Sequence, residues 1–243
     1  MFACQAKCRR FEPDFPLQGV MKRLIITIIF SFISLSAFAE AYALYDMNEH
    51  SVIESSNDSE ITSIASLTKL VTAMVCIDGG NCDERLLRKM LIRSDNKAAE
   101  KIAESYSTGR SRFITSMNLK VQSLGLKNTR FTDPSGLSVF NVSTAREYID
   151  VVMAAESYPL IKKISSTSKS KEGKRRFLVN TNHSLLDQFK NIVLSKTGYT
   201  RSAGRCLALV VIEGEKKYAI VILGEQSPDK RTKTAKRLIG MTH

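Results

Sequence analysis

Two residues near the start of an apolar helical stretch have the types and spacing of a nucleophile and its base. Ser66 and Lys69 are three positions apart, so both side chains lie on one face of a helix. A serine becomes a nucleophile when a nearby base takes its proton, and a lysine amine can serve if burial lowers its pKa. Backbone N–H groups at the helix N-terminus could stabilise an oxyanion. The alternative is a helix cap beside a solvated lysine.

A second polar motif, Ser94-Asp95-Asn96, falls in the break between two predicted helices. Short polar side chains at such a break could point into a cleft. The alternative is an ordinary helix N-cap, a position that serine, aspartate and asparagine all favour.

A third motif, Lys196-Thr197-Gly198, ends a β-like run and is followed by Tyr199. Glycine there would let a substrate backbone approach the strand, and the lysine and threonine could hold a carboxylate. A strand-to-turn transition explains this motif equally well. The order S-x-x-K, S-D-N and K-T-G, however, is the joint signature of penicillin-binding proteins and class A β-lactamases, and chance rarely produces it.

Hydrophobic periodicity predicts the elements that position these motifs. Apolar residues recur at helical spacing from Ile64 to Ile77, where Gly79 and Gly80 end the run. Further predicted helices cover 83–92, 96–106, 112–124, 144–155 and a C-terminal segment that begins at 228; predicted strands cover 41–46, 52–55, 176–180, 193–197, 205–212 and 217–223. With strands at both ends and helices between them, we predict an α+β fold whose sheet unites the N- and C-terminal segments.

Residues 21–39 have the layout of a secretory signal peptide: Met21, two basic residues, and an uncharged run that ends in small side chains. Cleavage is expected after Ala39 or Ala41. The uncharged run is shorter than the roughly 20 residues that span a bilayer, which favours cleavage over an uncleaved anchor. Because residues 1–20 precede a complete signal, we predict that they are a non-native or untranslated extension and that residues 40–243 form a single catalytic domain.

The predicted mature chain is strongly basic. Residues 1–39 hold five basic and two acidic residues, so their removal changes the net charge from +12 to +9. Export separates the chain from nucleic acid, which leaves the cell wall and the membrane surface as anionic partners. Seven basic residues and one acidic residue lie within 162–176. We expect a solvated loop there; the alternative is a contact with anionic wall polymer or lipid headgroups.

The cysteines and histidines limit the remaining chemistry. Cys76 and Cys82 flank a predicted helix end, so a local disulfide is an open alternative in an oxidising compartment. His50, His183 and His243 show no metal-binding spacing, so we predict neither a metal site nor a cofactor. The chain contains no G-x-S-x-G elbow, which disfavours Ser-His-Asp catalysis.

Beyond the three motifs, the chain resembles the serine-type D-alanyl-D-alanine peptidases, or low-molecular-mass penicillin-binding proteins, and within them the D-alanyl-D-alanine endopeptidases. The resemblance covers nearly all of residues 42–240 and includes the stretches 64–70, 128–131, 134–138, 141–146, 158–161, 180–183, 196–200 and 204–207. It implies a penicillin-binding-protein/β-lactamase-like fold, with an antiparallel sheet flanked by helices and an adjoining all-helical part. It also implies that Cys206 is a buried strand residue.

The resemblance implies a role for each motif residue. Catalytic roles fall to Ser66 as the acylated nucleophile, Lys69 as general base and Ser94 as the proton carrier. Substrate-binding roles fall to Asn96 for the substrate amide, to Lys196 and Thr197 for the carboxylate, to Gly198 at the strand, and to the backbone N–H groups of Ser66 and Tyr199 for the oxyanion.

We therefore predict a periplasmic or secreted enzyme that hydrolyses D-Ala-containing peptide bonds of peptidoglycan stem peptides through an acyl-enzyme on Ser66, with β-lactams as acylating inhibitors. Cross-link endopeptidase activity is favoured because the chain ends some forty residues after Lys196, where carboxypeptidase relatives usually carry a further β-rich domain. D-Ala-D-Ala carboxypeptidase activity is the alternative.

A class A β-lactamase is disfavoured because no Glu-x-x-Leu-Asn string follows Ser94. A catalytically impaired penicillin- or wall-binding protein is a third interpretation, since the interval from Lys69 to Ser94 is shorter than is usual for the family.

Overall fold

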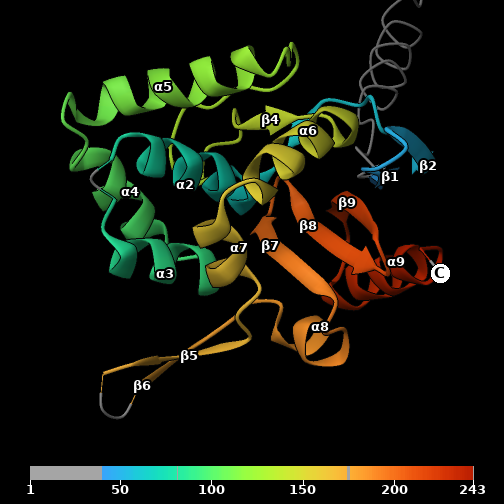
Figure 1. Cartoon of the computed structure of the whole chain (residues 1–243). Coiled ribbons are helices and arrows are strands. Elements are labelled where there is room, and N and C mark those ends of the chain that lie inside the picture. The colour runs from blue at the N-terminus through green and yellow to red at the C-terminus, as the bar shows by residue number, and fades with distance from the viewer. Residues whose placement is uncertain (1–39, 81, 174–175, 243) are drawn as a thin grey trace, which may run out of the picture. The chain divides into compact units, whose positions relative to one another are not determined.

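The main sheet brings the two ends of the described chain together. The computed structural model describes residues 40–80, 82–173 and 176–242. In the sheet, β1 (Ala41–Asp46) forms a hairpin with β2 (Ser51–Ser56) and pairs with β9 (Lys216–Glu225). With β7 (Ile192–Thr200) and β8 (Gly204–Glu213), the strand order is β2-β1-β9-β8-β7, antiparallel throughout (Figure 1). The predicted α+β fold, with a sheet that unites the two terminal segments, is confirmed.

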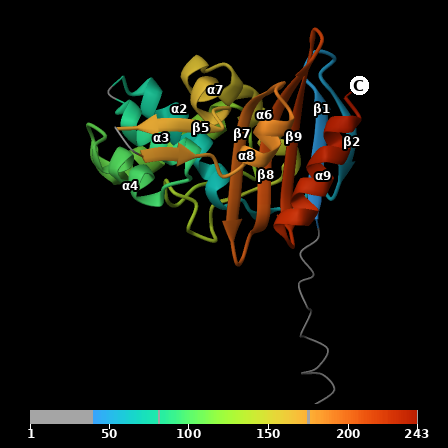
Figure 2. The same cartoon turned by 90° about the horizontal axis from the view of Figure 1, so that it is seen from below.

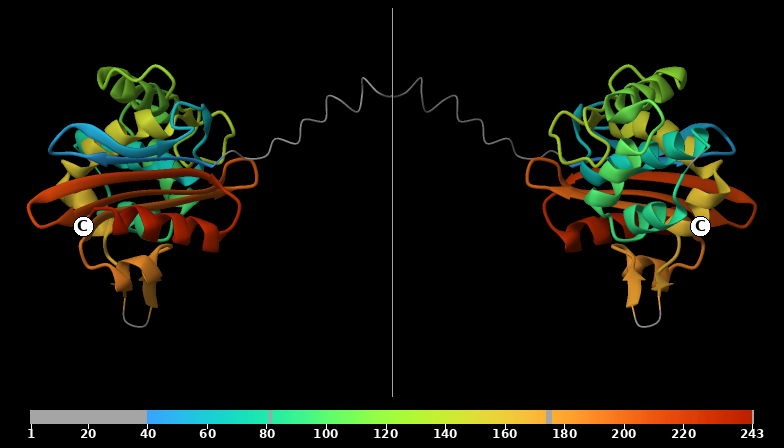
Figure 3. Two further views of the ribbon diagram at one scale, coloured as in Figure 1. Left: turned by 90° about the vertical axis from the view of Figure 1, so that its right-hand side faces the viewer. Right: turned by 90° about the vertical axis from the view of Figure 1, so that its left-hand side faces the viewer.

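Helices cover both faces of this sheet. The first turn after β3 is a 3₁₀ helix, η1, which runs directly into α2. The bounds are η1 (Ala65–Thr68), α2 (Lys69–Asp78), α3 (Glu84–Ile92), α4 (Asn96–Glu104), α5 (Gly109–Ser123), α6 (Ala145–Glu156), α7 (Pro159–Ser165), α8 (His183–Gln188) and α9 (Pro228–Gly240). Figure 2 and Figure 3 show α8 and α9 on one face of the sheet and the larger set of helices on the other.

Alternating side chains of β8 divide the hydrophobic core between these two layers. Cys206 and Ala208 belong to the cluster that contains α2 and α6, whereas Leu207 and Leu209 belong to the cluster that contains α8 and α9. Neighbouring side chains of a strand point to opposite faces, so one apolar strand serves both layers. Cys206 is fully buried, as the resemblance implied.

The segment between α7 and α8 is not the solvated loop that we expected for 162–176. Helix α7 occupies its first part, and β5 (Lys169–Glu172) pairs antiparallel with β6 (Arg176–Val179) in a separate two-stranded sheet. Ser170 and Leu178 face each other across this hairpin and are buried. Lysines occupy the outward positions of β5, and only every second residue turns inward. The strand pattern was therefore hard to recognise in the sequence. Another two-stranded sheet pairs β3 (Thr62–Ser63) with β4 (Val142–Ser143).

A disulfide closes the turn between α2 and α3. It joins Cys76 to Cys82, whose Cα atoms are 5.2 Å apart, and resolves the alternative that the sequence left open. The predicted extension, signal peptide and cleavage sites lie outside the described residues, and the single catalytic domain for 40–243 stays a prediction. Within 40–80, 82–173 and 176–242, we find no helix with both the length and the apolar character needed to cross a membrane.

Gly136 makes a close backbone contact that no other residue fits, and its replacement should destabilise the fold. Its φ is +84°, and a Cβ there would lie 1.9 Å from the carbonyl oxygen of Ala65. We expect Gly136→Ala to lower the free energy of unfolding by at least about 2 kcal/mol, measured by urea denaturation. Gly214→Ala is the matched control, because φ is +58° there but nothing lies within 4 Å of the added Cβ; it should cost about 1 kcal/mol. Equal stability of the two variants would contradict the contact.

Candidate active site

The backbone that carries Ser66 is held between two glycines. Gly136 lies against Ala65, and a Cβ on Gly198 would lie only 3.1 Å from the backbone nitrogen of Ser66. Ala65 has a φ of +47°, in the left-handed region that a non-glycine residue rarely adopts. The missing side chain of Gly198 therefore leaves space for the backbone of Ser66, whereas we expected from the sequence that this space would admit a substrate backbone.

The amine of Lys69 lies within hydrogen-bonding distance of Ser66, as their spacing predicts. Lys69 Nζ is 2.8 Å from Ser66 Oγ and 2.7 Å from Asn96 Oδ1, and it also donates to the carbonyl oxygen of Ser135. The Lys69 side chain is completely buried although it lies in the first turn of α2. The solvated lysine that was the alternative interpretation is therefore wrong.

Burial changes the protonation of Lys69. It lowers the pKa of the amine from 10.5 to about 7, even though the nearby carboxylates of Asp133, Asp95 and Glu100 act in the opposite direction. A buried ammonium loses hydration that these contacts only partly replace. Near neutral pH a substantial fraction of Lys69 is thus an unprotonated amine, which can accept the hydroxyl proton of Ser66.

The Ser94-Asp95-Asn96 motif divides its side chains between the cleft and a helix cap. Asp95 accepts a hydrogen bond of 3.0 Å from the backbone N–H of Ala98 and so caps α4. Ser94 has a φ of +59°, and its hydroxyl accepts a hydrogen bond of 2.9 Å from Lys196 Nζ. The N-cap interpretation is correct for Asp95, while Ser94 and Asn96 line the cleft.

Lys196 and Thr197 meet the other motifs from the edge strand of the main sheet. Lys196 Nζ also donates to the Thr197 carbonyl oxygen at 2.7 Å, and Thr197 Oγ1 lies 2.6 Å from Thr181 Oγ1. Burial, followed by the positive charges of Lys69 and Arg231, holds the pKa of Lys196 well below its usual value. A bound carboxylate would reverse this effect by pairing with the ammonium. The site therefore favours an anionic group beside Thr197.

The cleft between these residues has a volume of about 280 Å³. Its lining includes the predicted residues Ser66, Ser94, Asn96, Thr197, Gly198 and Tyr199, together with Thr181, Arg205 and Arg231, which sequence reasoning missed. Cavities of about 600 and 630 Å³ lie elsewhere and contain none of the three motifs. We assign the candidate site to the smaller cleft because Ser66, the predicted nucleophile, lines it and is hydrogen-bonded to Lys69, its predicted base.

Two missed arginines add positive charge to the cleft. The guanidinium of Arg205 lies over the Tyr199 ring, 3.6 Å from its centroid, and Arg205 stands opposite Tyr199 in the β7–β8 register. The Nε atoms of Arg205 and Arg231 are buried without a hydrogen-bond partner in the described part of the chain. Arg231 comes from α9. Its position in a basic C-terminal run gave no signal that it would reach the cleft.

A missed carboxylate organises the turn that supports Lys69. Asp133 accepts hydrogen bonds from the backbone N–H groups of Ser135 and Gly136, both at 2.6 Å, and of Ser138 at 2.7 Å. Burial acts to raise the pKa of Asp133, but a hydrogen bond from the Ser135 hydroxyl, together with these backbone bonds, outweighs it and holds the pKa below its usual value. Pro134 and Gly136 are typical turn residues, but nothing in the sequence shows that this turn contacts Lys69.

This fold is that of the penicillin-binding proteins. The ampicillin-bound form of penicillin-binding protein D2 from Listeria monocytogenes matches with a TM-score of 0.77 and 25% sequence identity, over 85% of this chain and 98% of that chain. The predicted penicillin-binding-protein-like fold is confirmed.

The sequence relatives define the family. The family model described as D-alanyl-D-alanine carboxypeptidase matches residues 81–227. The D-alanyl-D-alanine endopeptidase of Escherichia coli K12 is 36% identical over 217 residues, covering 74% of this chain and 69% of the relative. The D-alanyl-D-alanine carboxypeptidase DacF of Bacillus subtilis is 26% identical over 275 residues, covering 90% and 70%. The chain belongs to the D-alanyl-D-alanine carboxypeptidase family and is a serine D,D-peptidase.

The rate at which penicillin acylates the protein should follow the protonation of Lys69. If the unprotonated Lys69 amine is the base that activates Ser66, the second-order rate constant will rise with pH and level off above an inflection near about 7. Stopped-flow labelling with a fluorescent penicillin between about pH 5.5 and 9 measures this.

Lys69→Arg is the control for this profile, because a guanidinium stays protonated throughout that range. We expect it to label slowly at every pH. A wild-type rate that does not change with pH, or one whose inflection lies near 10, would show that the Lys69 amine is not the titrating base.

Proposed function

We propose that this chain is an exported serine peptidase that hydrolyses D-Ala-containing peptide bonds of peptidoglycan through an acyl-enzyme on Ser66. The single observation that carries the proposal is the 2.8 Å contact between Ser66 Oγ and a fully buried Lys69 amine whose pKa is about 7. Ser94, which lines the same cleft as Ser66 and accepts a hydrogen bond from Lys196, supports it.

In the proposed acylation, unprotonated Lys69 takes the hydroxyl proton while Ser66 Oγ attacks the D-Ala carbonyl carbon. The backbone N–H groups of Ser66 and Tyr199 stabilise the oxyanion. When the C–N bond breaks, the proton passes through Ser94 to the leaving amine. Water then attacks the ester and gives its proton to Lys69, which restores the serine.

Two further contacts orient the substrate in this proposal. The amide of Asn96 holds the backbone of the donor peptide while its Oδ1 keeps its hydrogen bond to Lys69. Lys196 and Thr197 bind the carboxylate next to the scissile bond. The guanidinium groups of Arg205 and Arg231, which also line the cleft, keep that side of it positive. Stem peptides of peptidoglycan supply such carboxylates.

We favour cross-link endopeptidase activity over D-Ala-D-Ala carboxypeptidase activity. The 36% identical relative from Escherichia coli carries the endopeptidase name, whereas the carboxypeptidase DacF is 26% identical. A catalytically impaired binding protein is less consistent with the hydrogen bonds that join Lys69, Asn96, Ser94 and Lys196. We also propose that the protein acts in the periplasm after cleavage of residues 21–39, and that its basic surface contacts anionic wall or membrane.

Replacement of the nucleophile should abolish covalent labelling. We expect Ser66→Ala to reduce acylation by a fluorescent penicillin roughly a thousandfold or more, because among the described residues the Lys69 amine bonds to no other hydroxyl. Gel fluorescence after a timed incubation provides the measurement. Ser111→Ala, at an exposed position on α5, is the matched control and should label like the wild type. Equal labelling of Ser66→Ala and the wild type would refute the assignment of the nucleophile.

The bond that is cleaved can be read from the products formed from purified muropeptides. We expect cross-linked dimers to be converted to monomers, with Ser66→Ala as the inactive control. Chromatography of the muropeptides together with an assay of free D-Ala distinguishes the two activities. Release of D-Ala without loss of dimers would overturn the endopeptidase assignment and leave the D,D-peptidase assignment intact.

A further inference from the structure

The β5–β6 hairpin presents lysines and apolar residues together on its outer face. Ser170 and Leu178 turn inward, so the alternate positions turn outward. These outward positions pair Lys169 with Val179 and Lys171 with Phe177, and all four side chains are exposed. Phe177 is 61% exposed and Val179 is 41% exposed. Phe177 and Val179 lie two positions apart on the same strand, so they form one exposed apolar patch beside the two lysines.

This hairpin projects from the body of the molecule but is firmly attached to it. Figure 1 and Figure 3 show it extending away from the sheet and the helices, with its outer face clear of other described elements. On its inner side, the Arg88 guanidinium donates to Ser170 Oγ, and Lys89 forms an ion pair of 3.0 Å with Glu172. The outer face can therefore meet a flat surface without rearrangement of the fold.

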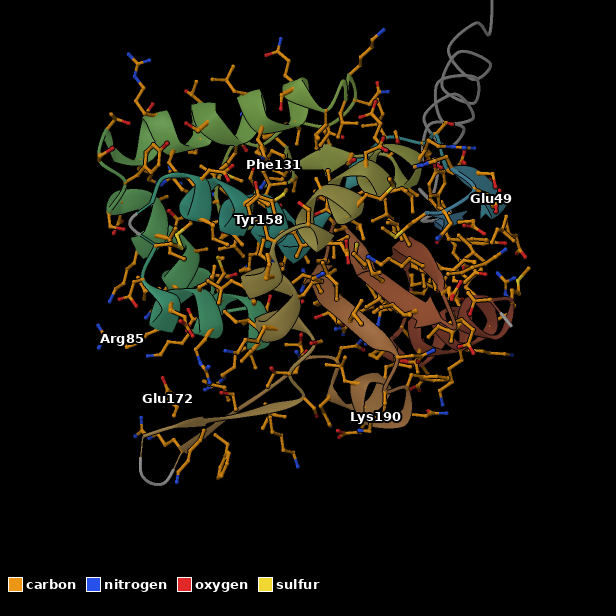
Figure 4. The ribbon with its side chains drawn as sticks, viewed as in Figure 1. Glu49, Arg85, Phe131, Tyr158, Glu172 and Lys190 are labelled. Carbon is orange, nitrogen blue, oxygen red and sulfur yellow. A yellow bond between two sulfur atoms is a disulfide. The ribbon has the colours of Figure 1, made fainter. Side chains whose placement is uncertain are left out.

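Behind the hairpin lies a basic groove of about 630 Å³ between α3, α4 and β5. Its charged lining consists of Arg85, Arg88, Lys89, Lys101 and Lys171 against Asp83 and Glu172. Figure 4 shows Arg85, Glu172 and Lys190 along the same lower side of the molecule. The excess of cations gives this end a positive field that attracts anionic groups.

We propose that the outer face of the β5–β6 hairpin, with the basic groove behind it, docks the protein on an anionic phospholipid bilayer. Near such a surface each lysine strengthens binding about fivefold. Phe177 and Val179 favour a bilayer over a water-soluble polyanion, because a polyanion would pair with the lysines and leave both apolar side chains in water. Lysine stems can lie along the apolar surface while their amines reach the phosphates.

Docking by this face would fix the position of the active-site cleft relative to the bilayer. Thr181 follows β6 by two residues, lines the cleft, and lies 2.6 Å from Thr197 at its Oγ1 atom. The hairpin is thus joined to the cleft by a short connection, in which Asn180 is buried. The protein would act on wall material next to the membrane. The docking itself does not depend on the proposed chemistry of Ser66.

The chain contains no tryptophan, so Phe177→Trp introduces a single fluorescent reporter at the proposed contact. We expect its emission to shift to shorter wavelength on addition of vesicles of mixed phosphatidylglycerol and phosphatidylcholine, and not with phosphatidylcholine alone. High salt should weaken the response, because surface charges are screened. Adding Lys169→Glu and Lys171→Glu should reduce vesicle affinity by more than about tenfold.

Phe140→Trp is the matched reporter control, because Phe140 is 60% exposed and precedes β4, at the opposite end of the molecule from the hairpin (Figure 1). Lys233→Glu with Lys236→Glu on α9 matches the change in charge. All variants keep residues 1–39, so binding through that segment affects them equally, and thermal unfolding checks that each is folded. No shift at position 177, an equal shift at position 140, or retention by isolated wall polymer but not by anionic vesicles would overturn the proposal.

Discussion

The site depends on one constraint, the burial of the Lys69 amine beside Ser66 Oγ. An isolated ammonium in a protein interior costs several kcal/mol, and the group escapes that cost by losing its proton. Three oxygens surround the amine, from Ser66, Asn96 and Ser135. They come from η1, α4 and the turn after α5, so elements far apart in the chain must meet at one atom. The depressed pKa is thus a property of the whole helical layer and its contact with the sheet.

These segments can approach one another because glycine, which has no side chain, stands where their backbones come into contact. Gly136 lies against Ala65 at a distance that a Cβ would not permit, and a Cβ on Gly198 would crowd the backbone nitrogen of Ser66 at 3.1 Å. Ala65 stays in a left-handed conformation because both neighbours hold it there. A strained residue directly before the nucleophile fixes where Ser66 Oγ points, and strain of this kind persists only when the surrounding packing over-determines it. The geometry of the nucleophile is therefore set mainly by contacts distant in sequence.

Sequence patterns predicted the parts of the molecule that depend on local chemistry. Hydrophobic periodicity located α2 and the strands of the main sheet, and the motifs located Ser66, Lys69, Ser94 and Lys196. Features that arise only from long-range contacts were missed. Arg231 looks like any basic residue of an exposed helix until α9 packs beside β8. Strand β6 was predicted as 176–180, but β5 resembled a loop because its lysines mask a short alternation. The short helices α7 and α8 give too few turns for a periodic signal.

The interval between Lys69 and Ser94 is short, yet Ser94 still lines the cleft. The match to the Escherichia coli relative spans 217 residues but uses only 74% of this 243-residue chain, so the relative carries residues within that stretch that this chain lacks. Here a disulfide between Cys76 and Cys82 closes the connection, and α3 leads directly to Ser94. The hydrogen bond from Lys196 to Ser94 is nevertheless made. Lys101 lines the basic groove and Asn96 lines the cleft, so both are built in part from α4, the helix that follows Ser94.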